Sequence, residues 1–179
     1  CQAAMVSPNF LFHVEIDQKP NDPNYKHAVT DVELASRLSY FLWSSMPDDE
    51  LLQLGIQNKL HLPQVMNAQI KRLVKDAKAK ALVDGFAAQW LHLRTLAIVF
   101  PDQQRFKDFN EDLKSCMKRE TEMYCDYIFR EDKSILDFSD SKYTFLNEKL
   151  AKHYGISDVQ GDDFRRVSLN MKMMPSNKL

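Results

Sequence analysis

A long amphipathic segment, Ala77–Leu93, is the sequence feature that most restricts the fold. At the 3.6-residue period of an α-helix, its large apolar side chains fall on one side, while Asp84, Ala88 and the lysines fall on the other. Burying Phe86 and Trp90 alone would contribute several kcal/mol, at about 25 cal/mol per Å² of apolar area removed from water. We therefore expect neighbouring helices to cover a face made of Ala79, Leu82, Val83, Phe86, Trp90 and Leu93.

The composition supports a helical domain and disfavours several classes of function. A chain of 179 residues is long enough for one domain with a substantial core, and its four glycines allow few tight turns. The formal net charge is −1 and the basic residues are scattered, which disfavours nucleic-acid binding. No uninterrupted apolar run reaches the length of a membrane span. We predict no nucleic-acid partner and no transmembrane segment, whereas homo-oligomer formation stays open.

The cysteines and histidines have no metal-ligand or haem-attachment spacing. Cys1, Cys116 and Cys125 form neither a CxxC nor a CxxCH pattern. None of the five histidines is four residues from another on a predicted helix. The chain also contains no GxSxG motif and no glycine-rich phosphate loop. We therefore predict no metal site, no cofactor in this chain and no recognisable catalytic residue.

Helix-start signals predict an all-α, single-domain assembly of about six helices. Thr30–Glu33 is a capping-box pattern, so a helix should run from there to about Trp43. Acidic, proline and asparagine residues that favour the first turn mark most of the later helices. Phe164–Leu169 is compatible with one short extended segment. The later helices are expected to begin near Asp48, Pro63, Ala77, Asn110 and Thr144, the fourth of them reaching about Arg130 and the last ending at Gly155.

Changes in composition suggest three segments along the chain. Residues 1–29 contain the end of a helix and a polar, proline-bearing loop, which we interpret as the remnant of an upstream region. Residues 30–155 form the helical core domain. Residues 156–179 form an extended C-terminal tail that leads to a missing or altered next domain.

Two aromatic residues, Tyr40 and Trp43, lie beyond the predicted core stripe of the helix that begins at Thr30. They make its last turn apolar nearly all round. That turn is either deeply buried or part of an interface, so Tyr40 and Trp43 are candidate contact residues.

Glu120 projects from the middle of a predicted apolar stripe on the helix that follows Asn110. Arg37 and Gln89 each lie at the edge of the stripe on their own helices. Because an unpaired buried carboxylate costs several kcal/mol or stays protonated, we expect Arg37, Gln89 and Glu120 to form a buried polar cluster. The cluster is either a structural ion pair that sets helix register or a polar site whose carboxylate acts as acid or base.

Four motifs carry a family resemblance: Ser7–Phe12, Leu34–Asp48, Phe86–Leu91 and Tyr143–Glu148. Over about residues 5–168, the chain resembles the helical domain of unknown function found in large planctomycete and verrucomicrobial proteins, commonly alongside planctomycete-type cytochrome c domains. The resemblance implies a piece of an exported, extracytoplasmic protein whose neighbouring domains can supply haem c. It implies no catalytic residue. From Met171 the chain departs from the Gly-rich segment of the family, which is why the next domain is expected to be missing or altered.

Two functions remain in view at this point. The first is a noncatalytic scaffold or interaction module whose partners are other domains of the parent protein. The alternative is a redox or hydrolytic enzyme domain that uses Glu120 and is completed by a neighbouring domain. A module needs an exposed apolar surface, whereas an enzyme needs a solvent-connected pocket with convergent polar groups.

Overall fold

The computed structural model describes residues 6–8, 21–24, 26, 28–102 and 104–169. Most of the N-terminal segment 1–29, including the predicted helix end before Ser7 and the apolar motif that follows Pro8, lies outside the described residues. Residues 170–179 of the predicted C-terminal tail also lie outside them.

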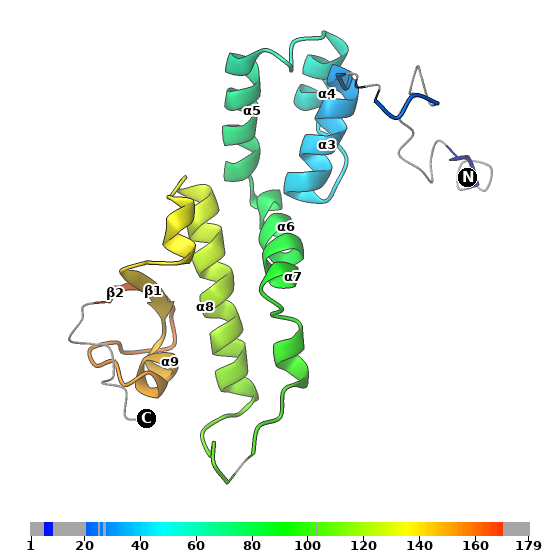
Figure 1. Ribbon diagram of the computed structural model, residues 1–179. Helices are drawn as coiled ribbons and strands as arrows, with labels where there is room; N and C mark the ends of the chain where they lie inside the picture. Colours follow the sequence, from blue (N-terminus) through cyan, green and yellow to red (C-terminus); the bar gives the residue numbers. More distant parts are fainter. Residues whose placement is uncertain (1–5, 9–20, 25, 27, 103, 170–179) are drawn as a thin grey trace. The chain divides into compact units, whose positions relative to one another are not determined.

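Helices dominate the described chain, and a small two-stranded sheet lies near its C-terminal end (Figure 1). The described residues form six helices when the continuous run from Ala77 to Trp90 is counted as one and the short turns η3 and η4 are left out, which confirms the predicted fold class. The elements are α3 Asp31–Trp43, α4 Asp49–Ile56, α5 Pro63–Lys75, η1 Ala77–Ala79, α6 Lys80–Leu82, η2 Val83–Ala87, α7 Ala88–Trp90, η3 Thr95–Ile98, α8 Glu111–Arg130, η4 Ile135–Phe138, β1 Tyr143–Leu146, α9 Glu148–His153 and β2 Arg165–Ser168.

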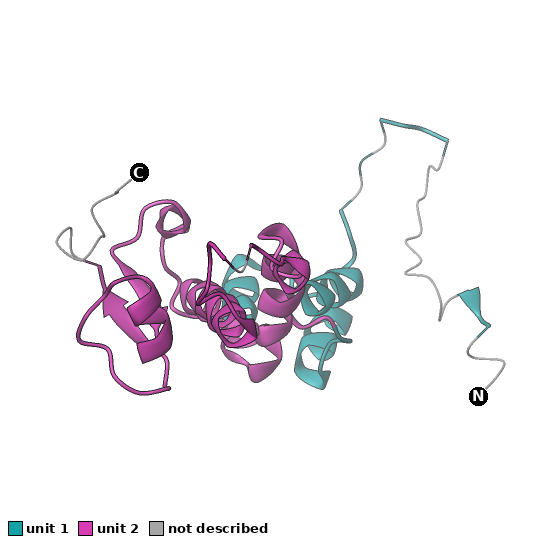
Figure 2. Ribbon diagram, turned by 90° about the horizontal axis from the view of Figure 1, so that it is seen from below, with its two compact units in different colours: residues 1–41, 45–70 teal, residues 42–44, 71–179 magenta. Residues whose placement is uncertain are grey.

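The described chain separates into two compact units (Figure 2). Unit 1 contains the described residues up to Phe41 together with Ser45–Ile70, so it holds most of α3, all of α4 and the first part of α5. Unit 2 contains Leu42–Ser44 and the described residues from Lys71 onward, including α8, α9 and the sheet.

Side-chain caps start α3 and α4 in unit 1, as the sequence predicts. The Thr30 backbone N–H donates to Glu33 Oε2 over 2.8 Å, and the Glu33 N–H donates to Thr30 Oγ1 over 3.3 Å, which completes the capping box. Asp48 caps α4 by accepting from the Leu51 N–H over 3.0 Å. The Leu51 side chain is fully buried. The capping hydrogen bond from Leu51 to Asp48 and the burial of the Leu51 side chain therefore both stabilise the first turn of α4.

Gly55 allows α4 to approach the start of α3 closely within unit 1. A Cβ atom at this position would lie 2.9 Å from the Asp31 carbonyl oxygen and 3.2 Å from Val32 Cα. Backbone atoms cannot swing aside as a side chain can. We expect Gly55→Ala to destabilise the protein by about 1–3 kcal/mol, because overpacking exceeds the roughly 1 kcal/mol gained in helix propensity.

Equilibrium unfolding in urea measures that effect, and Gly85→Ala is the matched control. Gly85 lies in another helical turn, and a Cβ there would meet nothing within 4 Å. We expect Gly85→Ala to leave the free energy of unfolding unchanged or to raise it by up to about 1 kcal/mol. Equal midpoints for the two variants would contradict the close approach at Gly55.

In unit 2, α8 is flanked by the helical run from Ala77 to Trp90 and by the sheet with α9 (Figure 1). Asn110 caps α8 by accepting from the Leu113 N–H over 2.9 Å, and the helix ends at Arg130, both as the sequence predicts. Two groups of buried side chains hold these layers. The first contains Val83, Ala87 and Cys125, and the second contains Leu113, Leu146, Leu150, Ala151, Ile156 and Val159.

The predicted buried face of the segment Ala77–Leu93 is wrong at its two largest residues. Phe86 is 51% exposed and Trp90 is 52% exposed, whereas Leu82, Val83 and the small Ala87 and Ala88 are buried. The turn Val83–Ala87 is π-helical. A π turn takes more than 3.6 residues, so it rotates the following side chains away from the face expected of a regular α-helix. The rings instead contact each other at 6.0 Å between centroids, and Trp90 packs edge-on against Phe138 at 5.5 Å.

The predicted C-terminal helix is shorter than expected, because its first residues form a strand. Tyr143–Leu146 is β1, and it pairs antiparallel with β2 in a register that sets Tyr143 opposite Ser168 and Leu146 opposite Arg165. Asn147 then caps α9 by accepting from the Leu150 N–H over 3.0 Å. The predicted extended segment Phe164–Leu169 is confirmed as β2, but its partner strand was missed.

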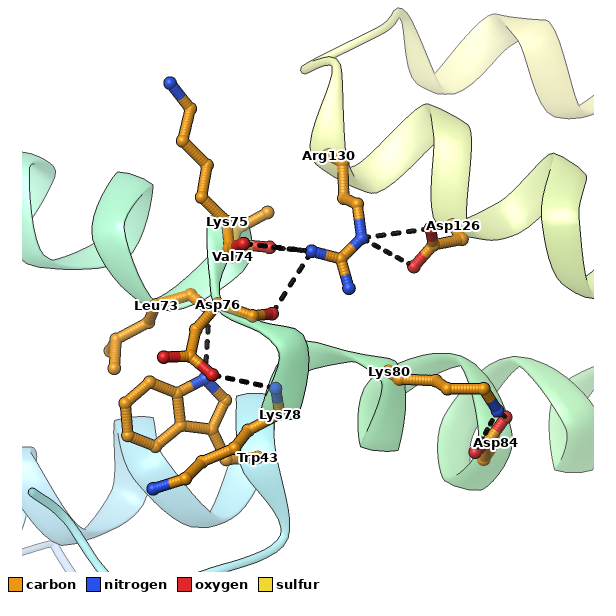
Figure 3. Close-up of polar contacts among 10 residues, drawn as sticks. All are labelled: Trp43, Leu73, Val74, Lys75, Asp76, Lys78, Lys80, Asp84, Asp126 and Arg130. Carbon is orange, nitrogen blue, oxygen red and sulfur yellow. Dashed lines mark hydrogen bonds and ion pairs between the residues drawn. The ribbon is translucent and has the colours of Figure 1, made fainter.

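Trp43 and Arg130 meet the end of α5 within unit 2 (Figure 3). The Trp43 Nε1–H donates to the Leu73 carbonyl over 2.9 Å, and Trp43 is only 4% exposed. Arg130 Nη1 donates to the carbonyl oxygens of Val74, Lys75 and Asp76 over 3.3, 3.1 and 3.1 Å, while its Nε donates to Asp126. Arg130 thereby supplies a donor to the Val74 and Lys75 carbonyls in the last turn of α5, whereas the Asp76 carbonyl also accepts from the Ala79 N–H over 3.1 Å.

The two candidate contact residues of α3 therefore differ in environment. Trp43 is buried in unit 2, with Lys78 Nζ 4.6 Å from its ring centroid. Tyr40 is 53% exposed. A role for Tyr40 in an interface stays a prediction.

Candidate functional site

Unit 2 contains an open cleft of about 820 Å³, built from α8, the segment around η4, β1 and the end of α9. This volume falls in the range of small-molecule sites. Its lining combines tyrosine rings, hydroxyl groups and two carboxylates with a few apolar side chains. The lining residues are Glu120, Thr121, Tyr124, Asp137, Phe138, Ser139, Ser141, Tyr143, Thr144, Lys152, His153, Tyr154, Gly155, Ile156 and Leu169. We call this surface the tyrosine cleft.

Regular elements hold the main polar side chains of the tyrosine cleft in place. Glu120 and Tyr124 are four residues apart on α8 and therefore lie on the same side of that helix. Thr144 belongs to β1, which pairs with β2. Tyr154 follows α9, and Gly155 has a φ of +70°, the left-handed conformation predicted for the end of this helix. The side chains around Glu120 are thus held by separate elements, a strand paired in a sheet and the capped end of a helix.

Both carboxylate oxygens of Glu120 accept hydrogen bonds from hydroxyl groups. Tyr154 Oη donates to Oε2 over 2.8 Å, and Thr144 Oγ1 donates to Oε1. Burial, together with the neighbouring Glu120 carboxylate, raises the pKa of the Tyr154 phenol above its ordinary range. Tyr154 therefore stays protonated and acts as a donor to Glu120.

The other two phenols donate to Asp137, one to its side-chain carboxylate and one to its backbone carbonyl. Tyr143 Oη donates to Asp137 Oδ2 over 2.8 Å, and Tyr124 Oη donates to the Asp137 backbone carbonyl. Burial raises the pKa of Tyr143, and the hydrogen bond to Asp137 raises it further. Burial also raises the pKa of Tyr124, with the Asp137 charge acting in the same direction. All three phenols of the tyrosine cleft are thus neutral hydrogen-bond donors at neutral pH.

The predicted cluster of Arg37, Gln89 and Glu120 has a different environment at each residue. Arg37 is exposed in unit 1, Gln89 is exposed on α7, and Glu120 is half-buried in the tyrosine cleft. The contacts of Glu120 within unit 2 are the hydroxyls of Thr144 and Tyr154. Burial of all three predicted residues is therefore not observed, and a pairing of Arg37 with Glu120 stays a prediction.

Sequence reasoning identified Glu120 but missed the groups that surround it. Tyr124 could have been recognised, since it lies four residues from Glu120 on the same predicted helix. The sequence pattern predicts a helix at Thr144, whereas the residue lies on β1, and a helix would not give its side chain this orientation toward Glu120. Asp137 lies only six residues before Tyr143, whereas Tyr124 of α8 reaches the Asp137 carbonyl because the chain folds back after α8.

The described part of the chain contains neither a metal-binding group of side chains nor a helix that could cross a membrane. Among residues 6–8, 21–24, 26, 28–102 and 104–169, no three His, Cys, Asp or Glu side chains come together in a group that could hold a metal ion. No helix in those same ranges is both long enough and apolar enough to span a bilayer.

The chain is similar to one known protein family. Residues 29–156 match the family PSD4, described as a protein of unknown function (DUF1592). The chain belongs to the DUF1592 family. No curated protein and no solved structure matches the chain. The match confirms the predicted resemblance to a helical domain of unknown function, and no activity accompanies it. An association with planctomycete proteins or with cytochrome c domains stays a prediction.

The tyrosine cleft of this DUF1592 domain has the features of a binding site. Every lining residue except Leu169 lies within the matched range. Polar groups converge from several elements, and Phe138, Ile156 and Leu169 supply apolar surface. Such a combination can orient a small organic group by hydrogen bonds while its apolar part contacts rings and aliphatic side chains.

Proposed function

We propose that this DUF1592 domain is a noncatalytic binding module that holds an organic group in the tyrosine cleft. The observation that carries the proposal is the fixed arrangement of Glu120. Its two oxygens accept from Tyr154 and Thr144, so the domain itself holds the carboxylate in one orientation. A preorganised polar group of this kind loses little conformational entropy when a ligand binds.

A catalytic role for Glu120 is the alternative, and the same geometry supports it less well. A general acid or base needs a proton or a lone pair directed at the substrate. In the described structure each Glu120 oxygen already faces a hydroxyl of the domain. A redox or hydrolytic reaction would therefore need groups from a neighbouring domain, and none of the residues described here is assigned such a step.

The proposed setting of the module is a larger exported protein whose other domains are its partners and carry haem c. The support is the family resemblance of the motifs Leu34–Asp48 and Tyr143–Glu148. Fractionation of the source cells with an antibody against this domain tests the setting. We expect the antigen outside the cytoplasm, in a polypeptide that stains for haem. A cytoplasmic antigen would contradict export, and an extracytoplasmic antigen without haem would contradict the cytochrome association.

Blocking the tyrosine cleft tests the binding function. Ser139 is an exposed lining residue, so Ser139→Trp should fill the cleft without removing the hydrogen bonds at Glu120. We expect at least one compound from a panel of organic cations, anions, sugars and neutral alcohols to raise the melting temperature of the native protein. The same compound should have no such effect on Ser139→Trp, because stabilisation requires binding to the folded state.

Ser115→Trp is the matched control for this experiment. Ser115 is exposed on α8 and does not line the tyrosine cleft. The shift in melting temperature should survive in Ser115→Trp. A shift retained by Ser139→Trp, or the absence of any shift across the panel, would refute binding in the tyrosine cleft.

A further inference from the structure

The hydrogen-bond donors of the tyrosine cleft are almost all engaged within the protein. Six of its hydroxyls donate to protein acceptors. They are Thr121 to the Met117 carbonyl, Tyr124 to the Asp137 carbonyl, Ser141 to the Tyr143 carbonyl, Tyr143 to Asp137 Oδ2, Thr144 to Glu120 Oε1 and Tyr154 to Glu120 Oε2. A hydroxyl has one proton to donate but two lone pairs. The oxygens that remain available to a ligand are therefore mostly acceptors.

The backbone around the tyrosine cleft likewise offers a ligand fewer hydrogen-bond donors than acceptors. The N–H groups of Tyr154, Gly155 and Ile156 donate to carbonyls of α9, and the Leu169 N–H donates to the Lys142 carbonyl over 2.7 Å. These backbone donors are thus unavailable to a ligand. A ligand that only accepts hydrogen bonds finds few partners here, whereas a ligand that donates them finds many.

The carboxylates and aromatic rings of the cleft add a second preference, which concerns the charge of the ligand. Glu120 and Asp137 supply two carboxylates, and Tyr124, Tyr143 and Phe138 form a connected group of rings with centroids 5.6 and 6.1 Å apart. Carboxylates attract cations, and the negative faces of aromatic rings do the same. Both features favour a positively charged ligand over an anionic one.

Three basic side chains near the tyrosine cleft oppose this preference only weakly. Lys152 lies at the rim with its side chain 74% exposed, and its Nζ is 2.6 Å from Glu148 Oε1, which balances its charge. His153 is also exposed. Arg166 lies 5.7 Å from the Tyr143 ring centroid but is not a lining residue. The two lining carboxylates therefore dominate the interior of the cleft.

Resting on the proposed binding function, we infer that the tyrosine cleft binds a primary ammonium group carried on an apolar body. The ammonium supplies three donors to an acceptor-rich surface. Its apolar body contacts Phe138, Ile156 and Leu169. Such a group occurs on free organic amines and on lysine side chains, and the experiment below separates these two sources.

Calorimetric titration of the full chain tests the ligand class with compounds of matched size. Pentylammonium is the probe, 1-pentanol is its neutral counterpart and pentanoate is its anionic counterpart. We expect pentylammonium to bind at least about tenfold more tightly than either counterpart, a preference that weakens as salt screens the carboxylates. Equal binding of pentylammonium and 1-pentanol, tighter binding of pentanoate, or undetectable binding of pentylammonium would each overturn the inference.

Variants that neutralise the two carboxylates test whether Glu120 and Asp137 cause the preference for pentylammonium over 1-pentanol. The double variant Glu120→Gln, Asp137→Asn should bind pentylammonium no more tightly than 1-pentanol, provided that its circular dichroism spectrum matches that of the native protein. Asp112→Asn is the control, because this carboxylate is exposed, pairs with Lys149 and does not line the cleft. Asp112→Asn should keep the preference. A preference that survives in the folded double variant would overturn the assignment, and the charge selectivity of the native protein remains decisive if the double variant does not fold.

Nα-acetyl-lysine methylamide separates the two sources of the ammonium group. Affinity equal to that of pentylammonium supports a lysine side chain of a partner protein, and loss of affinity supports a free amine. Different results would contradict the ammonium ligand and the general binding function. If 1-pentanol or a sugar binds in the tyrosine cleft and pentylammonium does not, the ligand class is wrong while the binding module stands.

Discussion

Trp43→Ala is expected to lower the free energy of unfolding by about 3–5 kcal/mol, the range for removal of a large buried aromatic side chain. The Trp43 ring is 4% exposed, so alanine would leave a cavity within unit 2. The substitution also removes the Nε1–H that donates to the Leu73 carbonyl over 2.9 Å. The Leu73 carbonyl would keep only its longer hydrogen bond from the Asp76 N–H, over 3.3 Å, so the lost Nε1–H bond adds to the destabilisation. Equilibrium unfolding in urea, followed by circular dichroism, measures the change.

Tyr40→Ala is the control for this prediction, because Tyr40 lies one turn earlier on α3 and is 53% exposed. We expect a loss below about 1 kcal/mol, as is usual for surface substitutions. Similar losses for Trp43→Ala and Tyr40→Ala would show that burial at the end of α3 does not decide stability there.

Arg130→Met is expected to cost about 2–3 kcal/mol in the free energy of unfolding. Methionine keeps much of the apolar stem of arginine but removes the donors that reach the carbonyls of Val74, Lys75 and Asp76. Hydrogen bonds from a charged donor are each worth roughly 1.5–3 kcal/mol, and one Nη1 group shared among three carbonyls delivers only part of that sum. The same urea experiment provides the measurement.

Lys80→Met is the matched control, since it also removes a cation that pairs with an aspartate (Figure 3). The Lys80 and Asp84 side chains are 56% and 47% exposed, and exposed ion pairs contribute little. We expect a change below about 0.5 kcal/mol. Arg130→Lys should fall between the two, because an ammonium cannot present the planar fork of the guanidinium. A loss for Lys80→Met as large as that for Arg130→Met would contradict the helix-end role of Arg130.

The sequence by itself determined the helical class and most helix starts. Thr30, Asp48 and Asn110 each accept from a backbone N–H in the first turn of their own helix. Gly155 adopts the left-handed conformation that ends α9. These interactions join residues within a few positions of one another, so the local sequence contains all the chemistry they need.

Only the tertiary structure decided which aromatic faces are buried and which side chains surround Glu120. The π turn Val83–Ala87 leaves Phe86 and Trp90 half exposed, a change of phase that periodicity could not anticipate. β1 and β2 pair across about twenty residues, and Thr144 on β1 meets Glu120 on α8, 24 residues earlier in the chain. The physical reason is that strand pairing and side-chain convergence depend on chain segments far apart in the sequence, whose contacts override the local preference for helix.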